Sequence, residues 1–309
     1  MRDAYLELII VTHNSAQFLA GLAQSFTDIL AEVEADADAP GPPAARDISV
    51  IIADTGSTDD TPACAKAAFP AAVILPLPNI GYGAAANVAI ARARAPWVLL
   101  CNADITFEPG FGRHMIGSIL TGALPGPPEF AHEKTAIVAP ELRNPDGTLQ
   151  PSIGIFPTLG SVVCDQFRPR PWRKYVSHPP TAPARINWAT GACLLLRKAA
   201  FESVGGFDEK YFLYVEEVDL QKRLAMAGFH GIVLPDAKVT HHAPNAARAP
   251  RAAAQKWAAR GMLRYFAAHG NAADRIGFGL LALASGRLSP GDALASCATI
   301  LSRATGPQL

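Results

Sequence analysis

Apolar and polar stretches alternate regularly over the first hundred residues. Four continuous apolar runs have the length and character of strands buried on both faces: residues 6–12, 48–53, 72–77 and 97–101. The segments between them predict helices that begin near Asn14 or Ser15, at 58 and at 83, and that end near 34, 68 and 95. This alternation predicts an α/β fold with an open, mostly parallel central sheet flanked by helices.

The later elements are spaced less evenly. We expect strands at residues 135–139, 192–197 and 231–234, the last ending before Pro235, and a helix at 217–227. After His242 the chain is rich in Ala and predicts two or three helices. Pro-rich loops are expected at 35–47, 124–134 and 168–185, and the acidic first of these is expected to be mobile.

Composition narrows the class of protein. The 309 residues are 50% hydrophobic, which excludes a globally disordered chain. Lys and Arg together number 27, as do Asp and Glu, and this balance argues against a nucleic-acid partner. The charge is uneven, however: residues 1–47 hold two basic and eight acidic residues, whereas residues 246–309 hold eight basic and two acidic ones.

Compartment and anchoring follow from cysteines and hydropathy. The five cysteines are scattered without a CxxC pair, as in a reduced chain. The first strand begins within a few residues of Met1, which leaves no room for a signal peptide, and no apolar run approaches the roughly 20 residues of a membrane span. We therefore expect a cytoplasmic protein.

Small polar residues follow all four N-terminal strands. They are Thr12-His13-Asn14, Asp54-Thr55-Gly56-Ser57, Asn79-Ile80-Gly81 and Asn102-Ala103-Asp104. Ligands of open α/β sheets bind outside the carboxyl ends of the strands, so these residues predict one shared site. Asp54-Thr55-Gly56 does not indicate an aspartic protease, because those enzymes need two such copies in an all-β fold. The glycines at 81 and 83 do not indicate a dinucleotide site, because that fingerprint follows the first strand and these follow the third.

Three carboxylates open the helix predicted near residue 217. Crowding of Glu216, Glu217 and Asp219 raises at least one pKa and suits a general base, although acidic residues also favour a helix N-terminus on their own. Asp104 at a strand end is a candidate ligand for a hard divalent cation. His241 is either a metal ligand or a hydrogen-bonded core residue.

Ordered motifs across residues 6–245 resemble one known family. They read VTHN, ADTGSTDDT, NIGYGAAAN, CNADITFEPG, TGACLLLRKAAFESVGGFDEKYFLYVEEVDLQKRL and PDAKVTHH. This set is similar to the family 2 inverting glycosyltransferases of GT-A fold, in the rhamnosyltransferase-like branch. The resemblance implies a hexosyltransferase-type enzyme that uses Mn²⁺ or Mg²⁺.

The resemblance also implies roles for individual residues. The nucleotide-sugar site would consist of Thr12, His13, Asn14, Asp54, Gly56, Asn79, Gly81, Asn87, Asn102 and Asp104, with Asp54 on the pyrimidine base. Asp104 and His241 would hold the metal, although Asn102 replaces the first aspartate of the family's DxD motif. Glu217 stands where the family has its catalytic aspartate, one methylene longer, with Glu216 and Asp219 as alternatives.

The predicted organisation is a catalytic domain at residues 1–245, with a nucleotide-sugar half to about 105 and an acceptor half after it, and a helical extension at 246–309. The predicted reaction moves a sugar from dTDP-rhamnose or a UDP-sugar to a saccharide or polyprenyl-diphosphate-linked acceptor in cell-surface polysaccharide synthesis. Rhamnose is the preferred candidate for the sugar. The alternatives are a transferase for another sugar such as a UDP-hexose or galactofuranose, an inactive sugar- or nucleotide-binding protein, and a nucleotidyltransferase.

The extension carries its own prediction. Lys256, Arg260 and Arg264 recur every four residues and would form a basic stripe on a helix. Such a stripe predicts contact with the inner face of the cytoplasmic membrane. The competing interpretation is that these helices pack on the catalytic domain or form a homodimer contact.

Overall fold

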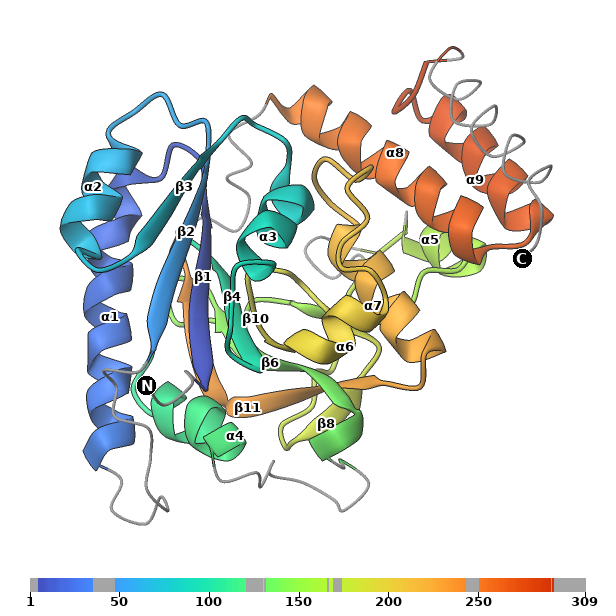
Figure 1. The fold of residues 1–309 in the computed structure, drawn as a ribbon. Helices are drawn as coiled ribbons and strands as arrows, with labels where there is room; N and C mark the ends of the chain where they lie inside the picture. Colours follow the sequence, from blue (N-terminus) through green and yellow to red (C-terminus); the bar gives the residue numbers. More distant parts are fainter. Residues whose placement is uncertain are drawn as a thin grey trace.

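The computed structural model describes residues 5–35, 48–120, 130, 132–165, 167–168, 174–242, 250–289 and 291. Over these residues a central sheet carries helices on both faces, and a further group of helices lies beside it (Figure 1). The predicted α/β class is therefore confirmed. The expected loop at 35–47 lies outside the described residues except for Ala35, which ends the first helix.

The four N-terminal apolar runs form neighbouring parallel strands. They are β1 (Leu6–Thr12), β2 (Ser49–Thr55), β3 (Val73–Leu77) and β4 (Trp97–Asn102). The order is β3-β2-β1-β4, so β1 lies between β2 and β4. The strand order reverses beside β1, and this topology leaves a crevice at the carboxyl ends of β1 and β4.

The rest of the sheet mixes directions. An antiparallel strand, β10 (Cys193–Arg197), pairs with both β4 and β6 (Thr135–Arg143). Beyond β6 the sheet continues with a parallel strand and two antiparallel ones, β11 (His230–His241), β5 (Ile105–Phe107) and β8 (Ala184–Ile186). A separate two-stranded ribbon joins β7 (Ile153–Gly154) to β9 (Trp188–Ala189). Within the described residues, six of the nine strands of the large sheet run in the same direction.

Each face of the sheet has its own hydrophobic core. One core packs the sheet against α1 (Ala16–Ala35), α2 (Thr61–Ala68) and the π-helical turn η2 (Gly112–Gly117), which leads into α4 (Ser118–Leu120). The other packs it against α3 (Tyr82–Ile90), α6 (Lys198–Ser203) and α7 (Glu216–Met226). A short 3-10 turn, η3 (His132–Lys134), precedes β6. Because both faces are covered, the strands read as continuous apolar runs rather than alternating ones.

The C-terminal helices share a third core with the rest of the chain. Helices α8 (Arg251–His269) and α9 (Ala272–Ala284) form a hairpin beside α5 (Leu159–Asp165) (Figure 1). Their buried residues Leu263, Phe266 and Phe278 join a cluster with Trp188 and Tyr211. The helices therefore pack on the sheet domain, as the competing interpretation of the extension expected.

The basic stripe predicted on α8 is not a free outward face. Arg264 forms an ion pair with Asp208, and its guanidinium carbon lies 5.5 Å from the centre of the Tyr211 ring. Lys256 and Arg260 also have interaction partners. Because Arg264 is used in an internal contact, the three residues do not form one uniformly solvent-facing row, and contact of this stripe with a membrane stays a prediction.

Several predicted element boundaries differ from the structure; the strand expected at 135–139, for example, continues to Arg143. Two of the differences have a clear physical reason. The strand expected to stop at 234 continues to His241, since Pro235 lies within a register shift between Leu234 and Lys238, where no ladder hydrogen bond is required. The helix expected to reach 95 ends at Ile90. There the chain turns so that the backbone N–H groups of Arg94 and Ala95 donate to the Glu7 carboxylate.

Candidate active site

A cleft of about 400 Å³ opens at the carboxyl ends of β1 and β4. Its wall brings together segments that are far apart in the sequence: the ends of β1, β2, β4 and β11, the start of α3, the loop before β10, the first turn of α7, and α8. The lining residues are Val11, Thr12, His13, Asn14, Ser15, Thr55, Asn79, Gly81, Tyr82, Asn102, Ala103, Asp104, Thr190, Gly191, Ala192, Phe212, Leu213, Tyr214, Glu216, Glu217, His241 and Trp257. The shared site predicted from the strand ends therefore forms.

The end of β1 is tied to the loop after β2. Asn14 adopts a left-handed backbone (φ 48°), its N–H donates to Ser57 Oγ at 2.8 Å, and its side-chain oxygen accepts from Thr58 N at 2.7 Å. The His13 ring nitrogen Nδ1 lies 2.9 Å from the Thr55 carbonyl oxygen. These contacts fix the two polar side chains at the mouth of the cleft.

Neither Asp54 nor Gly56 is among the residues that line the cleft. The Asp54 carboxylate is 5% exposed and accepts from Thr12 Oγ1 at 2.9 Å and from Ser57 Oγ at 2.5 Å. Gly56 has φ +70° and forms the turn after β2. In this structure both residues support the cleft, whereas the sequence placed them against the nucleotide.

The start of α3 is held against the loop that precedes α7. Gly81 has φ +90°, and a Cβ there would collide with the Phe212 carbonyl oxygen, which also accepts from Tyr82 N at 3.1 Å. Tyr82 Oη donates to the Gly191 carbonyl at 2.8 Å. Asn79 lines the cleft, but Asn87 does not: its amide bonds both backbone groups of Phe207 at 2.9 Å.

Asp104 and His241, which the resemblance assigns to a cation, lie side by side in the cleft. His241 Nε2 lies 3.3 Å from Asp104 Oδ1, and His241 Nδ1 lies 3.2 Å from Gln150 Oε1, which orients the ring. Two ligands about 2.1 Å from an octahedral ion, at right angles, would be about 3.0 Å apart, so the pair fits one divalent cation. Among the described residues there is no group of three or more His, Cys, Asp and Glu residues that could hold a metal.

Glu216 and Glu217 begin α7 and point into the cleft from a strained turn. The two residues that precede the first residue of the helix, Tyr214 (φ 72°) and Val215 (φ 75°), both have a left-handed backbone conformation. Such backbone strain in non-glycine residues is concentrated at functional sites. Glu216 and Glu217 are 5% and 8% exposed, and the Oε2 atom of each is buried without a hydrogen-bond partner among the described residues.

The two glutamates differ in their electrostatics. Burial raises the pKa of Glu216 well above its ordinary value, and the charge of Glu217 raises it further. Burial also raises the pKa of Glu217, but the positive charge of Lys174 opposes that rise. Two neighbouring buried carboxyl groups do not both ionise readily. Because the pKa of Glu217 is raised less, we expect Glu217 to lose its proton first.

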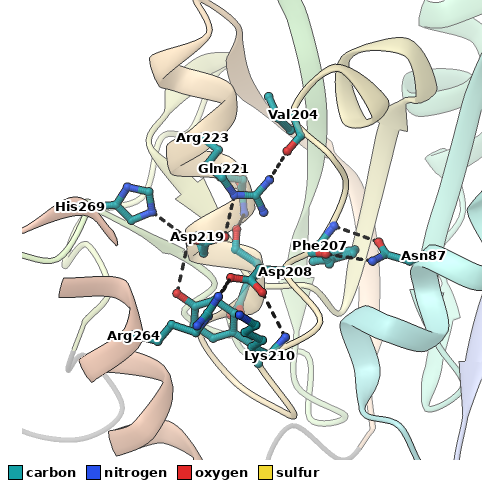
Figure 2. A network of polar contacts seen from close by, with 12 residues as sticks. Asn87, Val204, Phe207, Asp208, Lys210, Asp219, Gln221, Arg223, Arg264 and His269 are labelled. Atoms are coloured by element: carbon teal, nitrogen blue, oxygen red, sulfur yellow. Dashed lines mark hydrogen bonds and ion pairs between the residues drawn. The ribbon is translucent and has the colours of Figure 1, made fainter. Parts of the chain in front are cut away.

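Asp219, the other alternative for the base, lies outside the cleft wall. Its two oxygens bind His269 Nε2 and Arg223 Nε, each at 2.8 Å, and its carboxylate is 4% exposed (Figure 2). Burial alone would raise the pKa of Asp219, but the hydrogen bonds and charges of His269 and Arg223 bring it below the ordinary value. Asp219 therefore connects α7 to α8.

Several wall residues were not identified from the sequence. Trp257 comes from α8, its ring centre 4.7 Å from that of Phe212, and Thr190–Ala192 precede β10. The TGAC motif was a sequence signal for Thr190–Ala192, because small residues before a buried strand allow a ligand to approach the backbone closely. Nothing in the local pattern around Trp257 distinguishes it from a core aromatic residue.

Three comparisons with known proteins agree with this geometry. The family model described as "Glycosyl transferase family 2" matches residues 7–125. The chain is 38% identical over 216 residues to the N-acetylglucosaminyl-diphospho-decaprenol L-rhamnosyltransferase of Mycobacterium tuberculosis, covering 64% of this chain and 67% of that protein. It is 34% identical over 82 residues to rhamnosyltransferase WbbL of Escherichia coli, covering 26% and 31% of the two chains.

Solved structures share the fold at low identity. A mannosyltransferase from Pyrobaculum calidifontis in complex with GDP-Man and Mn²⁺ matches with a TM-score of 0.50 and 17% identity, covering 100% of this chain and 77% of that one. GalNAc-T7 with UDP, GalNAc and Mn²⁺ matches with a TM-score of 0.52 and 12% identity, covering 84% and 48%. These likenesses concern the fold alone.

Proposed function

Because this chain belongs to glycosyl transferase family 2 and is a rhamnosyltransferase-like glycosyltransferase, we propose that it moves rhamnose from dTDP-rhamnose to N-acetylglucosamine carried on a polyprenyl diphosphate, with inversion at the anomeric carbon. The observation that carries this proposal is the 38% identity to a relative named for that acceptor, over 67% of the relative's length. A UDP-sugar donor or a free saccharide acceptor is the alternative within the same reaction class.

The polar side of the cleft is the proposed position of the donor. Thr12, His13, Asn14 and Asn79 line that side, and side-chain and backbone groups there can bond a pyrimidine and its deoxyribose. Asp54 would act on the base only through Thr12 and Ser57, as a positioning residue. The diphosphate would lie toward Asn102, Asp104 and His241, which also line the cleft.

A divalent cation held by Asp104 and His241 would supply charge neutralisation for the departing diphosphate. The buried position of this pair, with side-chain exposures of 16% and 10%, limits competition from water. Asn102, at the end of β4, presents an amide where the family has a carboxylate, so it can bond a phosphate or sugar hydroxyl without adding negative charge.

Glu217 is the proposed general base. In the transfer step a hydroxyl oxygen of the acceptor bonds to the anomeric carbon, the carbon–oxygen bond to the diphosphate breaks on the opposite face, and the hydroxyl proton passes to Glu217. A buried carboxylate with a raised pKa and a vacant oxygen suits this role, because a base is most effective when its pKa approaches the working pH. Protonated Glu216 can donate a hydrogen bond to a neighbouring sugar hydroxyl.

A transfer assay tests the proposal. The purified protein is incubated with dTDP-rhamnose or UDP-sugars, Mn²⁺ or Mg²⁺, and a short-chain polyprenyl-diphosphate N-acetylglucosamine in detergent, and the product is weighed by mass spectrometry. Addition of one rhamnose is expected. Exclusive use of a UDP-hexose would contradict dTDP-rhamnose as the donor. Nucleotide-sugar binding without any turnover would support an inactive binding protein.

A further inference from the structure

The end of the molecule formed by α5 and α9 has an exposed apolar strip. It consists of Val163, Phe167, Ile276 and Leu280, whose exposed fractions are 40%, 86%, 65% and 62%. Among the described residues these are four of the seven exposed large hydrophobic side chains. Contiguous apolar surface of this kind marks an interaction site more often than scattered exposed residues do.

The four side chains belong to one surface because the two helices pack together. A Cβ at Gly277 of α9 would collide with Leu159 of α5, so the helices are in close contact there. Val163 and Phe167 follow Leu159 at successive intervals of four residues, and therefore continue the same row of α5 and the turn after it. On α9, Ile276 and Leu280 are four residues apart and lie in one row of the helix beside Gly277.

Helix α9 is apolar on both sides. Its inner face buries Phe278 and Ala282 against α8 and the rest of the third core, while Ile276 and Leu280 face outward. The sequence of α9 has one acidic residue, Asp274, which is used in the N-terminal capping box, and one basic residue, Arg275. A helix that is hydrophobic all round is expected to be covered on all sides.

We propose that this strip docks the enzyme on an anionic lipid bilayer, with Phe167, Ile276 and Leu280 entering the interface between headgroups and acyl chains. The inference rests on the proposed lipid-linked acceptor, which has to be reached at a membrane surface. No described helix is long and apolar enough to cross a membrane, so contact from one side is the arrangement that the described residues can provide.

Charge favours lipid over a second copy of this chain as the occupant. Arg275, next to Ile276, donates to the carbonyl oxygens of Phe266 and Gly270, which leave its positive charge in place beside the strip, whereas the charge of Arg168, next to Phe167, is offset by an ion pair with Asp165. Helices α8 and α9 together contain five Lys and Arg residues and one Asp, and of these Arg264 is paired with Asp208. Basic residues around an apolar face complement anionic headgroups, whereas a two-fold contact would bring like charges together.

The strip is also connected to the cleft. Helix α9 packs on α8 through Phe278 and Phe266, whose ring centres are 5.3 Å apart, and α8 supplies Trp257 to the cleft wall. A bilayer held by α9 would therefore lie on the α8 side of the active site. The acceptor could keep its lipid in the membrane while its sugar reaches Glu217.

Vesicle co-sedimentation tests the inference. The full chain is mixed with vesicles of phosphatidylcholine and phosphatidylglycerol, and Ile276→Glu/Leu280→Glu is compared with Met226→Glu, which alters a 71% exposed residue at the end of α7, outside the strip. The double variant is expected to bind at least about tenfold more weakly, because two apolar side chains lose their transfer from water. The control is expected to bind like the unaltered chain.

A second variant and a second readout keep the result interpretable. If Ile276→Glu/Leu280→Glu lowers the melting temperature, Val163→Ser/Phe167→Ser on α5 is used, with the same tenfold loss expected. Transfer to a water-soluble acceptor should be unchanged in both, and its absence in the unaltered chain would count against the proposed function alone. The docking proposal would be overturned if the unaltered protein does not sediment with vesicles at low salt. It would also be overturned if the strip variants convert a dimer to a monomer without changing vesicle binding.

Discussion

At the scale of single residues, the Glu216–Glu217 pair defines the chemistry. Glu217→Gln is expected to lower kcat by roughly 10²-fold or more while donor binding is retained, because the amide cannot accept the proton. Glu216→Gln is the matched comparison: burial and the charge of Glu217 raise the pKa of Glu216 well above its ordinary value, so an amide there replaces the carboxyl that keeps its proton more readily, with little change in shape. Single-turnover kinetics and calorimetric donor titration measure the two effects. An active Glu217→Gln beside a dead Glu216→Gln would reassign the base.

The same pair predicts the pH dependence of the rate. Burial raises the pKa of Glu217, so activity should fall on the acid side at a pH above the ordinary glutamate value of about 4.3. Lys174 opposes this rise, and its removal should move the acid limb to higher pH. A kcat–pH profile of Lys174→Met against the unaltered enzyme checks the direction; an unmoved or lowered limb would contradict it.

Asp104 gives a prediction about metal and donor together. Asp104→Asn keeps the size of the side chain but removes the negative charge beside His241, so Mn²⁺-dependent tightening of donor binding should be lost. Asp236→Asn, an exposed carboxylate on β11 outside the cleft wall, serves as the control. Calorimetry with and without Mn²⁺ measures the difference. Equal Mn²⁺ enhancement in Asp104→Asn and the unaltered chain would exclude Asp104 as a ligand.

At the scale of elements, α8 holds the turn that aims α7. A Cβ on Gly261 of α8 would meet the Tyr214 carbonyl oxygen at 2.8 Å and the Val215 side chain at 3.2 Å, and both residues are left-handed. The His269–Asp219 and Arg264–Asp208 contacts anchor the same segment on either side (Figure 2). The catalytic helix is thus positioned by a helix that comes after it in the chain.

Gly261→Ala should therefore lower kcat and stability, against the usual helix rule. Alanine normally stabilises a helix interior by about 1 kcal/mol relative to glycine. Gly279→Ala in α9 is the matched control, since its Cβ would lie 4.0 Å from Leu263, an ordinary contact. Thermal melts and kcat should separate the two, with Gly279→Ala at or above the unaltered melting temperature. A stabilised, fully active Gly261→Ala variant would contradict the conclusion that α8 positions the turn before α7.

At the scale of the whole molecule, the division into residues 1–245 and 246–309 remains a prediction. The third core suggests that the two parts depend on each other, because Trp188, Tyr211, Val215 and Val218 are covered by α8 and α9. A chain that stops after Ala243 should melt at a lower temperature and lose transfer activity, since it exposes this surface and frees the α7 turn. Circular dichroism and the transfer assay measure both. Unchanged melting and activity would make the extension a separate unit.

The sequence by itself determined the alternating strands and helices, and with them the carboxyl-end cleft. Buried parallel strands read as continuous apolar runs, and the residues after them must gather at one edge of the sheet. Thr12, His13, Asn14, Asn79, Asn102 and Asp104 follow from that rule and line one wall. The presence of Glu216, Glu217 and His241 in the same wall does not follow from it, because the glutamates begin a helix and the strand before His241 was expected to end at 234.

Only the tertiary structure decided which of these side chains face the cavity and what supports them. Asp54 and Asp219 are carboxylates like Asp104 and Glu217, yet Asp54 is bonded to Thr12 and Ser57 and Asp219 to His269 and Arg223. Trp257 enters the wall because α8 folds back over the sheet domain. Local patterns set period and polarity, but contacts between distant segments set which polar atoms are satisfied and which remain for a substrate.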